Sequence, residues 1–342
     1  YCTDAADVMA AVRYGREQNL DIAIRGGGHN GGGLGTVDDG LVIDLSMIKG
    51  VRVDPAARTA RVGGGCVWGE VDHATHAFGL ATPSGIIGTT GVGGLTLGGG
   101  LGYLSRKCGL TIDNLLEVDM VLADGSFVTA NAEQHPDLFW AVRGGGGNFG
   151  VVTSFLFRLH EIDTVVGGPM LWELDKATQF MQWYRDYIID APDDVNGFFA
   201  FLVVPPVEPF PEHLHLKTMC GIVWCYTGPH DQADQLFSPI RSRFGEPALD
   251  FVGPIPHPAL QGMFDALYPS GYQWYWRADF VKELPDAAIE KHLEYGSNLP
   301  SMFSTMHLYP INGAAGRVGA DETAWAYRDA TWGMVVAGVD PD

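Results

Sequence analysis

The pattern of apolar and polar positions over the first 160 residues predicts short strands and helices, which glycine-rich stretches separate. Val8 and Val12 share one face of a helix that begins after Thr3 or Asp4 and runs to about Gln18. The same reasoning predicts two further helices and seven strands. The helices are expected at 67–78 and 135–142, and the strands at 20–24, 41–45, 51–53, 60–62, 115–122, 127–129 and 151–159.

Glycine becomes rarer after residue 160, and aromatic residues and prolines become more frequent. Strands and helices in mixed order favour an α+β domain, with an antiparallel sheet covered by helices. Pro239 is expected to kink or break one of these helices. The expected helices span 174–189, 233–244 and 285–295, and the expected strands span 198–204, 213–226, 273–281 and 302–309. We therefore expect two domains, 1–160 and 161–342.

The 342 residues carry a formal net charge of −20, which limits the partners that the chain can bind. Nucleic acids require a basic face on a protein, and anionic membrane surfaces attract basic segments, so neither is expected as a partner. The acidic excess suits a well-solvated surface, either of an ordinary acidic enzyme or of a protein adapted to high salt.

The five cysteines lie at irregular spacing, and none forms a Cys-x-x-Cys pair. Neither a disulfide framework nor a structural zinc site is therefore indicated. No run of 18 apolar residues and no signal peptide are evident, which favours a cytoplasmic location. The chain opens at Tyr1, already near a helix, so a start further upstream is left open.

The segment Arg25-Gly26-Gly27-Gly28-His29-Asn30-Gly31 holds the most informative chemistry in the chain. A strand precedes it and no helix is expected after it, which argues against a dinucleotide fingerprint, because those glycines must open a helix. Two interpretations stay open at this point. The segment is either a loop that wraps a cofactor and presents an imidazole to it, or an ordinary glycine-rich turn with an exposed histidine.

Three glycine clusters lie in the first domain, at 25–35, 83–102 and 143–150. The middle cluster holds nine glycines and shows little helical periodicity. One ligand that touched all three would need close backbone approach over a long contact, which suits a dinucleotide whose pyrophosphate is held by backbone N–H groups. Three unrelated turns are the alternative, but runs of glycine lose conformational entropy that folding must offset.

Five motifs in order carry a family resemblance. They are Arg-Gly-Gly-Gly-His-Asn (25–30), Thr-Pro-Ser-Gly (82–85), Thr-Thr-Gly-Val-Gly-Gly-Leu-Thr-Leu-Gly-Gly-Gly-Leu-Gly-Tyr-Leu (89–104), Arg-Lys-Cys-Gly-Leu-Thr-Ile-Asp-Asn (106–114) and Gly-Gly-Gly-Asn-Phe-Gly-Val-Val (145–152). Together they resemble the FAD-linked oxidases of the berberine bridge enzyme type, within the vanillyl-alcohol oxidase or PCMH-type superfamily. The resemblance covers residues 3–160 closely and the rest loosely. It implies a two-subdomain PCMH-type FAD-binding domain.

The resemblance also implies the cofactor site. His29 matches the histidine that bonds covalently to the 8α-methyl group of FAD. The other positions that match cofactor-binding residues of the family are Arg25, Gly26, Gly27, Gly28, Asn30, Gly31, Ser84, Thr89, Thr90, Gly93, Gly94, Leu95, Thr96, Gly98, Gly102, Gly150 and Val152.

Three departures from the family pattern affect this expectation. Many relatives have a second covalent link through a cysteine, but Ile87 occupies that position, so a single link through His29 is expected. Leu95 stands where some relatives place a histidine close to the flavin, which leaves the redox potential open. Relatives also continue well past the equivalent of Asp342, so the chain is expected to lack the family's C-terminal segment.

An aromatic-rich run over residues 268–277 supplies candidates for substrate binding, because aromatic walls with a few polar groups commonly line ligand pockets. The candidates are Tyr272, Trp274, Trp276 and Arg277. Alternation on the strand 273–281 points Trp274 and Trp276 opposite to Tyr275 and Arg277. Core packing is the alternative for each aromatic residue.

The catalytic base is not identified by the sequence. The family's usual tyrosine base lies near its C-terminus, so the base is expected outside this chain, with Tyr103 and Tyr275 as the candidates within it. His213 and His215 share a predicted strand face, but no third ligand accompanies them, so no metal site is expected.

We therefore expect an FAD-dependent oxidoreductase that transfers hydride from an alcohol, sugar or amine carbon to covalently bound flavin, with dioxygen as acceptor. A dehydrogenase of the same fold with another acceptor is the first alternative. Thr90 maps to the position that controls oxygen access and is neither of the family's common aliphatic choices. A flavin-binding protein without turnover is the second alternative, and an enzyme using non-covalent NAD is the third.

Overall fold

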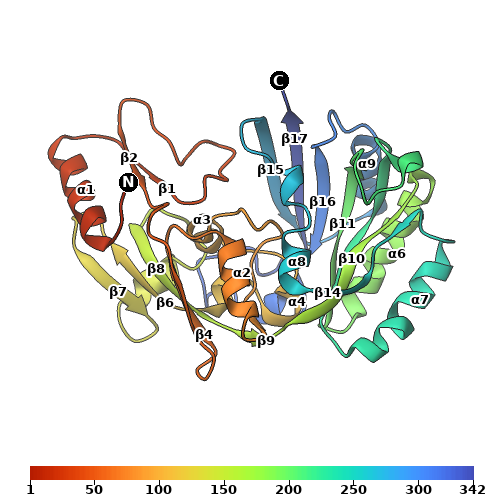
Figure 1. Cartoon of the computed structure of the whole chain (residues 1–342), viewed down its shortest axis with the longest axis horizontal. Coiled ribbons are helices and arrows are strands. Elements are labelled where there is room, and N and C mark those ends of the chain that lie inside the picture. The colour runs from red at the N-terminus through yellow and green to blue at the C-terminus, as the bar shows by residue number, and fades with distance from the viewer. The chain divides into compact units, whose positions relative to one another are not determined.

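A computed structural model describes all 342 residues, and the chain divides into two compact units (Figure 1). Unit 1 comprises Tyr1–Asp163, His257–Asp265 and Val318–Arg328. Unit 2 comprises Thr164–Pro256, Ala266–Arg317 and Asp329–Asp342. Two later segments of the chain thus pack with unit 1, and no periodicity in the sequence marks them.

A five-stranded antiparallel sheet in the order β3-β4-β8-β6-β7 forms the centre of unit 1. Alternate residues face its core, so Val62 on β4 and Phe155 and Phe157 on β8 are fully buried. All five strands were expected, and this prediction is confirmed. Their bounds are β3 (Val51–Asp54), β4 (Thr59–Gly63), β6 (Leu115–Val121), β7 (Phe127–Asn131) and β8 (Val151–Arg158).

Two smaller strand pairs complete the sheets of unit 1. β1 (Ile22–Arg25) pairs in parallel with β2 (Leu41–Asp44), and β5 (Leu80–Ala81) pairs with β9 (His160–Glu161). The glycine loop that follows β1 contains no helix, as expected.

The three helices expected in unit 1 are present, and four short helices were not expected. Helix α1 begins after Asp4, whose side chain accepts a hydrogen bond from the Asp7 backbone N–H at 3.0 Å. The stretch 83–102 was expected to lack helical character, yet its centre forms α3, because Val92 is fully buried and anchors that turn. The bounds are α1 (Ala5–Glu17), α2 (Trp68–His76), α3 (Val92–Leu97), α4 (Ser105–Cys108), η1 (Thr111–Asn114), α5 (Pro136–Ala141) and α8 (His257–Gln261).

Unit 2 is built on an eight-stranded antiparallel sheet in the order β13-β10-β12-β11-β16-β17-β15, with β14 beside β10. Strands β11 and β12 at its centre are almost entirely buried, so both faces of the sheet are shielded from solvent there. The bounds are β10 (Thr164–Trp172), β11 (Val195–Val203), β12 (Thr218–Tyr226), β13 (Leu249–Asp250), β14 (Gly253–Pro256), β15 (Gln273–Val281), β16 (Thr305–Pro310) and β17 (Trp332–Asp340).

Three longer helices cover one face of the unit 2 sheet. Phe180 of α6, Phe237 of α7 and Ile289 of α9 join one hydrophobic cluster with sheet residues such as Phe199 and Trp224. The α+β class, with an antiparallel sheet covered by helices, is therefore confirmed. The bounds are η2 (Leu174–Lys176), α6 (Ala177–Asp190), η3 (Glu212–Leu214), η4 (His230–Gln232), α7 (Ala233–Arg243), η5 (Asp265–Leu267), α9 (Asp286–Gly296) and α10 (Ala314–Arg317).

The structure corrects three expectations for unit 2. The strand expected at 213–226 begins only at Thr218, so His213 and His215 do not share a strand face. The chain turns before that strand, where Leu216 has a φ of 61°. Helix α7 continues through Pro239 and is not broken there. Strands β10 and β17 were not expected, and the Gly-Gly-Pro sequence inside β10 accounts for the first omission.

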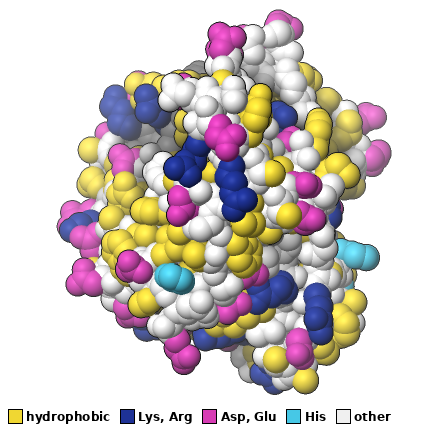
Figure 2. Space-filling view, turned by 90° about the vertical axis from the view of Figure 1, so that its left-hand side faces the viewer, with side chains coloured by type: hydrophobic (Ala, Val, Ile, Leu, Met, Phe, Trp, Pro, Cys, Tyr) yellow, Lys and Arg dark blue, Asp and Glu magenta, His cyan; other side chains and the backbone are white.

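Acidic and basic side chains are interspersed over the face of the molecule that Figure 2 shows. No helix of the chain is both long enough and apolar enough to cross a membrane.

A buried ion pair holds the segment Val318–Arg328 within unit 1. Both Arg328 terminal nitrogens donate to the Asp113 carboxylate, with Nη1 at 3.0 Å from Oδ2. The side chains are only 3% and 8% exposed, so water does not screen the pair. Nη2 also donates to Thr323 Oγ1 at 2.9 Å. Such bidentate charge-assisted bonds fix geometry as well as adding stability.

Replacing Arg328 by Ala is expected to destabilise unit 1 strongly, because the Asp113 carboxylate would stay buried without its partner. The expected loss is about 3–5 kcal/mol of unfolding free energy, measured by urea denaturation with circular dichroism. Arg317→Ala is the matched control, since its ion pair with Asp193 is solvent-exposed. Equal shifts in the two variants would contradict this assignment.

Candidate cofactor and substrate sites

The three glycine clusters predicted to share a ligand come together in unit 1. A Cβ atom built on Gly27 would lie 2.4 Å from the Gly91 Cα atom, so the first and second clusters touch backbone to backbone. The Gly146 N–H of the third cluster donates to the Leu97 carbonyl of the second at 2.9 Å. The clusters are therefore one continuous surface of backbone rather than three separate turns.

The first loop leaves β1 from a fixed point. Arg25 Nε donates to the buried Asp44 carboxylate on the neighbouring strand at 2.9 Å, and the Ser46 N–H donates to the same carboxylate. Burial alone would raise the pKa of Asp44, but these hydrogen bonds hold it below its usual value. Asp44 is thus a structural acceptor, and the guanidinium of Arg25 is engaged in holding the loop.

His29 lies across from the second cluster. Its Nε2 atom is 2.9 Å from Thr89 Oγ1. The residue is solvent-exposed as a whole, yet the atoms around its ring desolvate it enough to lower its pKa, while the charge of Asp265 acts in the opposite direction. The imidazole is neutral at neutral pH, which is the form that acts as a nucleophile.

The backbone around His29 has room for a large ligand. A Cβ atom on Gly28, Gly94 or Gly146 would meet nothing within 4 Å, so these glycines border open space. The buried hydroxyl groups of Thr82 and Thr96 have no hydrogen-bond partner within the protein. Open glycine backbone together with unpaired hydroxyl groups fits a dinucleotide such as FAD.

The other residues predicted for the cofactor lie in or beside this surface, with different degrees of exposure. Asn30 Oδ1 accepts a hydrogen bond from the Leu34 N–H at 3.1 Å, so it shapes its own loop. Leu95 packs near Gly85, where a Cβ atom would lie 2.8 Å from its side chain. Gly26, Gly31, Thr90, Gly93, Gly98 and Gly150 are at least partly exposed, whereas Ser84, Gly102, Val152 and the base candidate Tyr103 are buried.

The sequence analysis missed two carboxyl groups, Asp265 near His29 and Asp72 near Asp265. Asp265 Oδ1 accepts a hydrogen bond from the Gly88 N–H at 2.7 Å. Asp72 on α2 is only 2% exposed, and neither of its oxygens has a hydrogen-bond partner. Burial, and then the charge of Asp265, raise the pKa of Asp72 well above its usual value. Burial and the neighbouring Asp265 therefore favour the protonated form of Asp72.

In unit 2, the predicted substrate residues divide between the two faces of the sheet. Trp274 and Trp276 stack at 5.5 Å between ring centroids, while Arg277 Nε donates to the Tyr275 hydroxyl at 2.9 Å on the other face. Tyr275 is 63% exposed. Tyr272 lies just before β15, and its ring contacts the Phe303 ring. The predicted alternation along this strand is confirmed.

A buried histidine–tyrosine pair shares the sheet face of Trp274 and Trp276. The register pairs Trp276 with Ala337 and Ala337 with Thr305, so Thr305 and the alternate residues His307 and Tyr309 point to the same side. This side is opposite to the helix-covered core, which takes Met306 and Leu308.

His307 Nδ1 lies 2.8 Å from the Tyr309 hydroxyl, and the Phe198 ring packs against both rings. Burial lowers the pKa of His307 to about 3, so this imidazole is neutral. The sequence analysis missed this pair, although the alternation in the expected strand 302–309 placed the two residues on one face.

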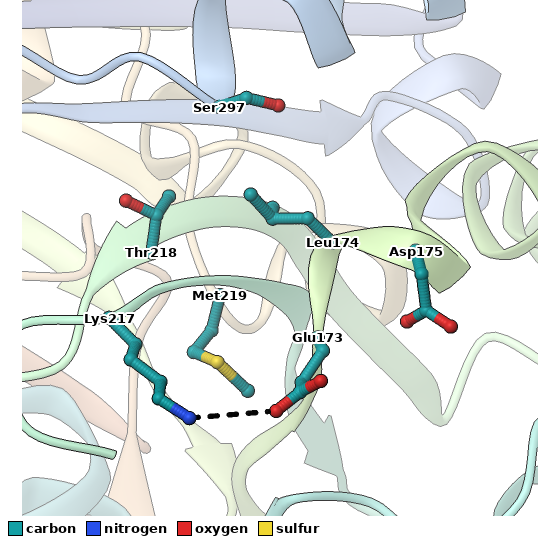
Figure 3. Close-up of a pocket in the computed structure, with 7 residues that line it drawn as sticks. All are labelled: Glu173, Leu174, Asp175, Lys217, Thr218, Met219 and Ser297. Carbon is teal, nitrogen blue, oxygen red and sulfur yellow. Dashed lines mark ion pairs between the residues drawn. The ribbon is translucent and has the colours of Figure 1, made fainter.

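A hollow of about 500 Å³ in unit 2 is separate from these residues (Figure 3). Lys217 Nζ lies 3.7 Å from Glu173 Oε1 at one side of it. Its lining consists of Glu173, Leu174, Asp175, Lys217, Thr218, Met219 and Ser297. None of the residues predicted for cofactor or substrate is among them.

Comparisons with known proteins agree with the cofactor predicted for unit 1. A family model described as an FAD binding domain matches residues 1–131. An FAD-linked oxidoreductase of Dictyostelium discoideum is 32% identical over 345 residues, covering 100% of this chain and 73% of the relative. The (R)-6-hydroxynicotine oxidase of Paenarthrobacter nicotinovorans is 41% identical over 172 residues, covering 50% of this chain and 38% of that enzyme.

Solved structures share the fold of the chain. The 6-hydroxy-D-nicotine oxidase of Arthrobacter nicotinovorans matches with a TM-score of 0.82 at 25% identity, covering 99% of this chain and 74% of that one. The BBE-like 1 protein of Physcomitrella patens matches with a TM-score of 0.85 at 25% identity, covering 100% of this chain and 75% of that one.

The buried Asp72 predicts an unusual dependence of stability on pH. In the unfolded chain Asp72 loses its proton near pH 4, whereas burial raises its pKa in the folded chain. The wild type therefore loses stability as the pH rises from the pKa of Asp72 in the unfolded chain toward its pKa in the folded chain. Asp72→Asn removes this loss. Thermal unfolding should give equal Tm values near pH 4 and a variant more stable by several degrees at pH 7, because about 1 kcal/mol corresponds to a few degrees.

The control for this prediction is Asp163→Asn, which changes a carboxylate that is 64% exposed in the same unit. The difference in Tm between Asp163→Asn and the wild type should not increase with pH. An Asp72→Asn protein that is less stable than the wild type at both pH values would contradict a protonated Asp72.

Proposed function

Since this chain belongs to the FAD-linked oxidoreductases of the berberine bridge enzyme type, we propose that it oxidises a small molecule at an alcohol, sugar or amine carbon. FAD supplies a two-electron acceptor that takes hydride from such a carbon. The protein's task is to bind the cofactor, orient the substrate and accept the substrate proton.

Unit 1 holds FAD on the joined glycine clusters. The observation that carries the proposal is the contact of Gly27 with Gly91 and of Gly146 with Leu97, which makes one backbone surface bordered by open space. Backbone N–H groups hold the pyrophosphate, and the unpaired hydroxyl groups of Thr82 and Thr96 are available as further donors. The predicted residues from Arg25 to Val152 line or support this surface.

His29 attaches the flavin covalently and is its only anchor. Its ring is neutral, lies at the border of the open surface and contacts Thr89. Ile87, which stands at the position of a second anchor in many relatives, is buried and offers no nucleophile. A covalent link fixes the ring system and saves the entropy of holding it.

Unit 2 binds the substrate on the sheet face that carries Trp274, Trp276, His307 and Tyr309. The stacked indole rings supply apolar surface for an organic ring. Tyr309 accepts the proton of the substrate hydroxyl or amine, and its own proton moves to the neutral His307 Nδ1 at 2.8 Å. Tyr275 and Arg277 point away from this face and take no part in the proposal.

The substrate class and dioxygen as acceptor rest on the family and on one relative. A relative that is 41% identical over half of this chain is named (R)-6-hydroxynicotine oxidase, and 6-hydroxynicotine is an amine. A substrate screen that follows bleaching of the visible flavin band tests the proposal, and peroxide release tests the acceptor. Bleaching without peroxide release would indicate a dehydrogenase, and no bleaching would indicate a flavin-binding protein without turnover.

We predict that the flavin colour of the wild type stays with the protein pellet after acid precipitation, because the link to His29 is covalent. His29→Ala should release all of its flavin into the supernatant while still binding FAD before precipitation, since the glycine surface is unchanged. Flavin absorbance of pellet and supernatant measures both results. A colourless wild-type pellet would contradict the covalent link but not FAD binding.

We also predict that Tyr309→Phe slows anaerobic flavin reduction by substrate about 10²–10⁴-fold, measured by stopped-flow absorbance, with unchanged flavin content. Tyr275→Phe tests the competing candidate for the base and should leave the rate unchanged. Slow flavin reduction in Tyr275→Phe, together with a wild-type rate in Tyr309→Phe, would assign the base to Tyr275 instead.

A further inference from the structure

A carboxylate and an imidazole reach the same dipeptide of the second glycine cluster. Asp265 Oδ1 accepts the Gly88 N–H at 2.7 Å, and the neighbouring Thr89 N–H also donates to this carboxylate. Thr89 Oγ1 lies 2.9 Å from His29 Nε2. Asp265 comes from the segment His257–Asp265, which is distant in sequence and packs within unit 1.

We propose that Asp265 is a positioning residue for His29: its carboxylate fixes the Gly88–Thr89 dipeptide against the imidazole, and its negative charge stabilises the positive charge that the ring gains as His29 bonds to the flavin. This inference rests on the covalent attachment proposed above. It concerns how the anchor forms and is separate from substrate oxidation.

In the attachment step, a bond forms between a His29 ring nitrogen and the 8α-carbon of FAD, while one imidazole N–H bond and one C–H bond of the 8α-methyl group break. The negative charge of Asp265 stabilises the ring while it is positively charged, and the exposed imidazole then gives its proton to water. The electron pair of the C–H bond and two protons, one of them taken up from water, remain on the flavin, which is then reduced by two electrons. Dioxygen removes two electrons and two protons as hydrogen peroxide.

The charges around the pair suit this role. Burial raises the pKa of Asp265 despite its backbone hydrogen bonds and the nearby His29. Desolvation lowers the pKa of His29, and Asp265 opposes that shift. Asp72 is the third titratable group of the cluster, and it is held protonated. One negative charge therefore faces one neutral imidazole.

Gly88 is the residue that makes this contact possible. A Cβ atom at that position would lie 2.9 Å from Asp265 Oδ2 and would push the carboxylate away from the loop. The backbone N–H groups need only an acceptor oxygen, which an amide side chain also supplies. A carboxylate is required only where its charge or its proton affinity is used.

Asp265→Asn therefore separates charge from position, because its amide oxygen still accepts the Gly88 N–H. The full chain is produced flavin-free from riboflavin-starved cells and mixed with FAD over a range of pH, and acid-precipitable flavin is followed with time. We expect attachment to slow about 10²-fold. We also expect the acid limb of the rate profile to move to lower pH, because the imidazolium loses its neighbouring charge.

Three further variants complete the experiment. Asp163→Asn removes an exposed carboxylate beside His76 and should leave both rate and profile unchanged. Asp265→Glu should recover part of the rate, and Gly88→Ala should slow attachment while every charge is kept. NMR titration of the flavin-free chain, with the His29 signal assigned through His29→Ala, should show a lower His29 pKa in Asp265→Asn only.

The outcomes separate this inference from the proposed function. A wild type that never retains flavin after precipitation overturns the covalent anchor and this inference together. A wild type that attaches flavin, with an Asp265→Asn variant of equal rate, profile and His29 pKa, overturns this inference alone. A slower variant with an unmoved acid limb and an unmoved His29 pKa limits Asp265 to holding the loop and overturns the role of its charge.

Discussion

The contact between Gly27 and Gly91 is the constraint on which the cofactor half of the structure depends. A Cβ atom on either residue would lie 2.4 Å from backbone atoms of the other, so no other amino acid fits. The contact joins the loop after β1 to the start of α3. His29 follows one glycine by two residues, and Thr89 precedes the other by two. Their 2.9 Å contact is therefore a direct consequence of the glycine packing.

The glycine clusters and their meeting were predictable from the sequence, because consecutive glycines in an ordered protein need a reason to be there. The five strands of the unit 1 sheet were predictable from alternation. Asp265 was not, since it lies in a short segment with no periodicity that returns to unit 1 from a distance of more than 170 residues to Gly88. Asp72 was missed for a different reason. Helical period places it beside Trp68 and Thr75 on the buried face, but a carboxylate at such a position is ordinarily taken as exposed.

His307 and Tyr309 show a further limit of local patterns. Alternation puts both on one face of the expected strand, yet it does not say which face the helices cover. That information lies in the register with β11 and β17, which pairs His307 with Ala200 and with Val335. Strand β17 itself was not expected. The chemistry of the pair became visible only with long-range pairing, because a histidine on a solvated strand face and a buried histidine with a pKa of about 3 have the same local sequence.

The charge at His29 is decided by a few buried groups rather than by the net charge of −20. Surface carboxylates separated from His29 by more than about 10 Å are largely screened at ordinary ionic strength. Asp72 and Asp265 are not screened in this way, and two neighbouring carboxylates in a poorly solvated place do not both ionise. Asp72 is the more deeply buried and stays protonated, which leaves Asp265 free to carry the charge. The unpaired buried carboxyl on α2 thus costs stability, while desolvation of its ring keeps the imidazole of His29 neutral against the opposing charge of Asp265.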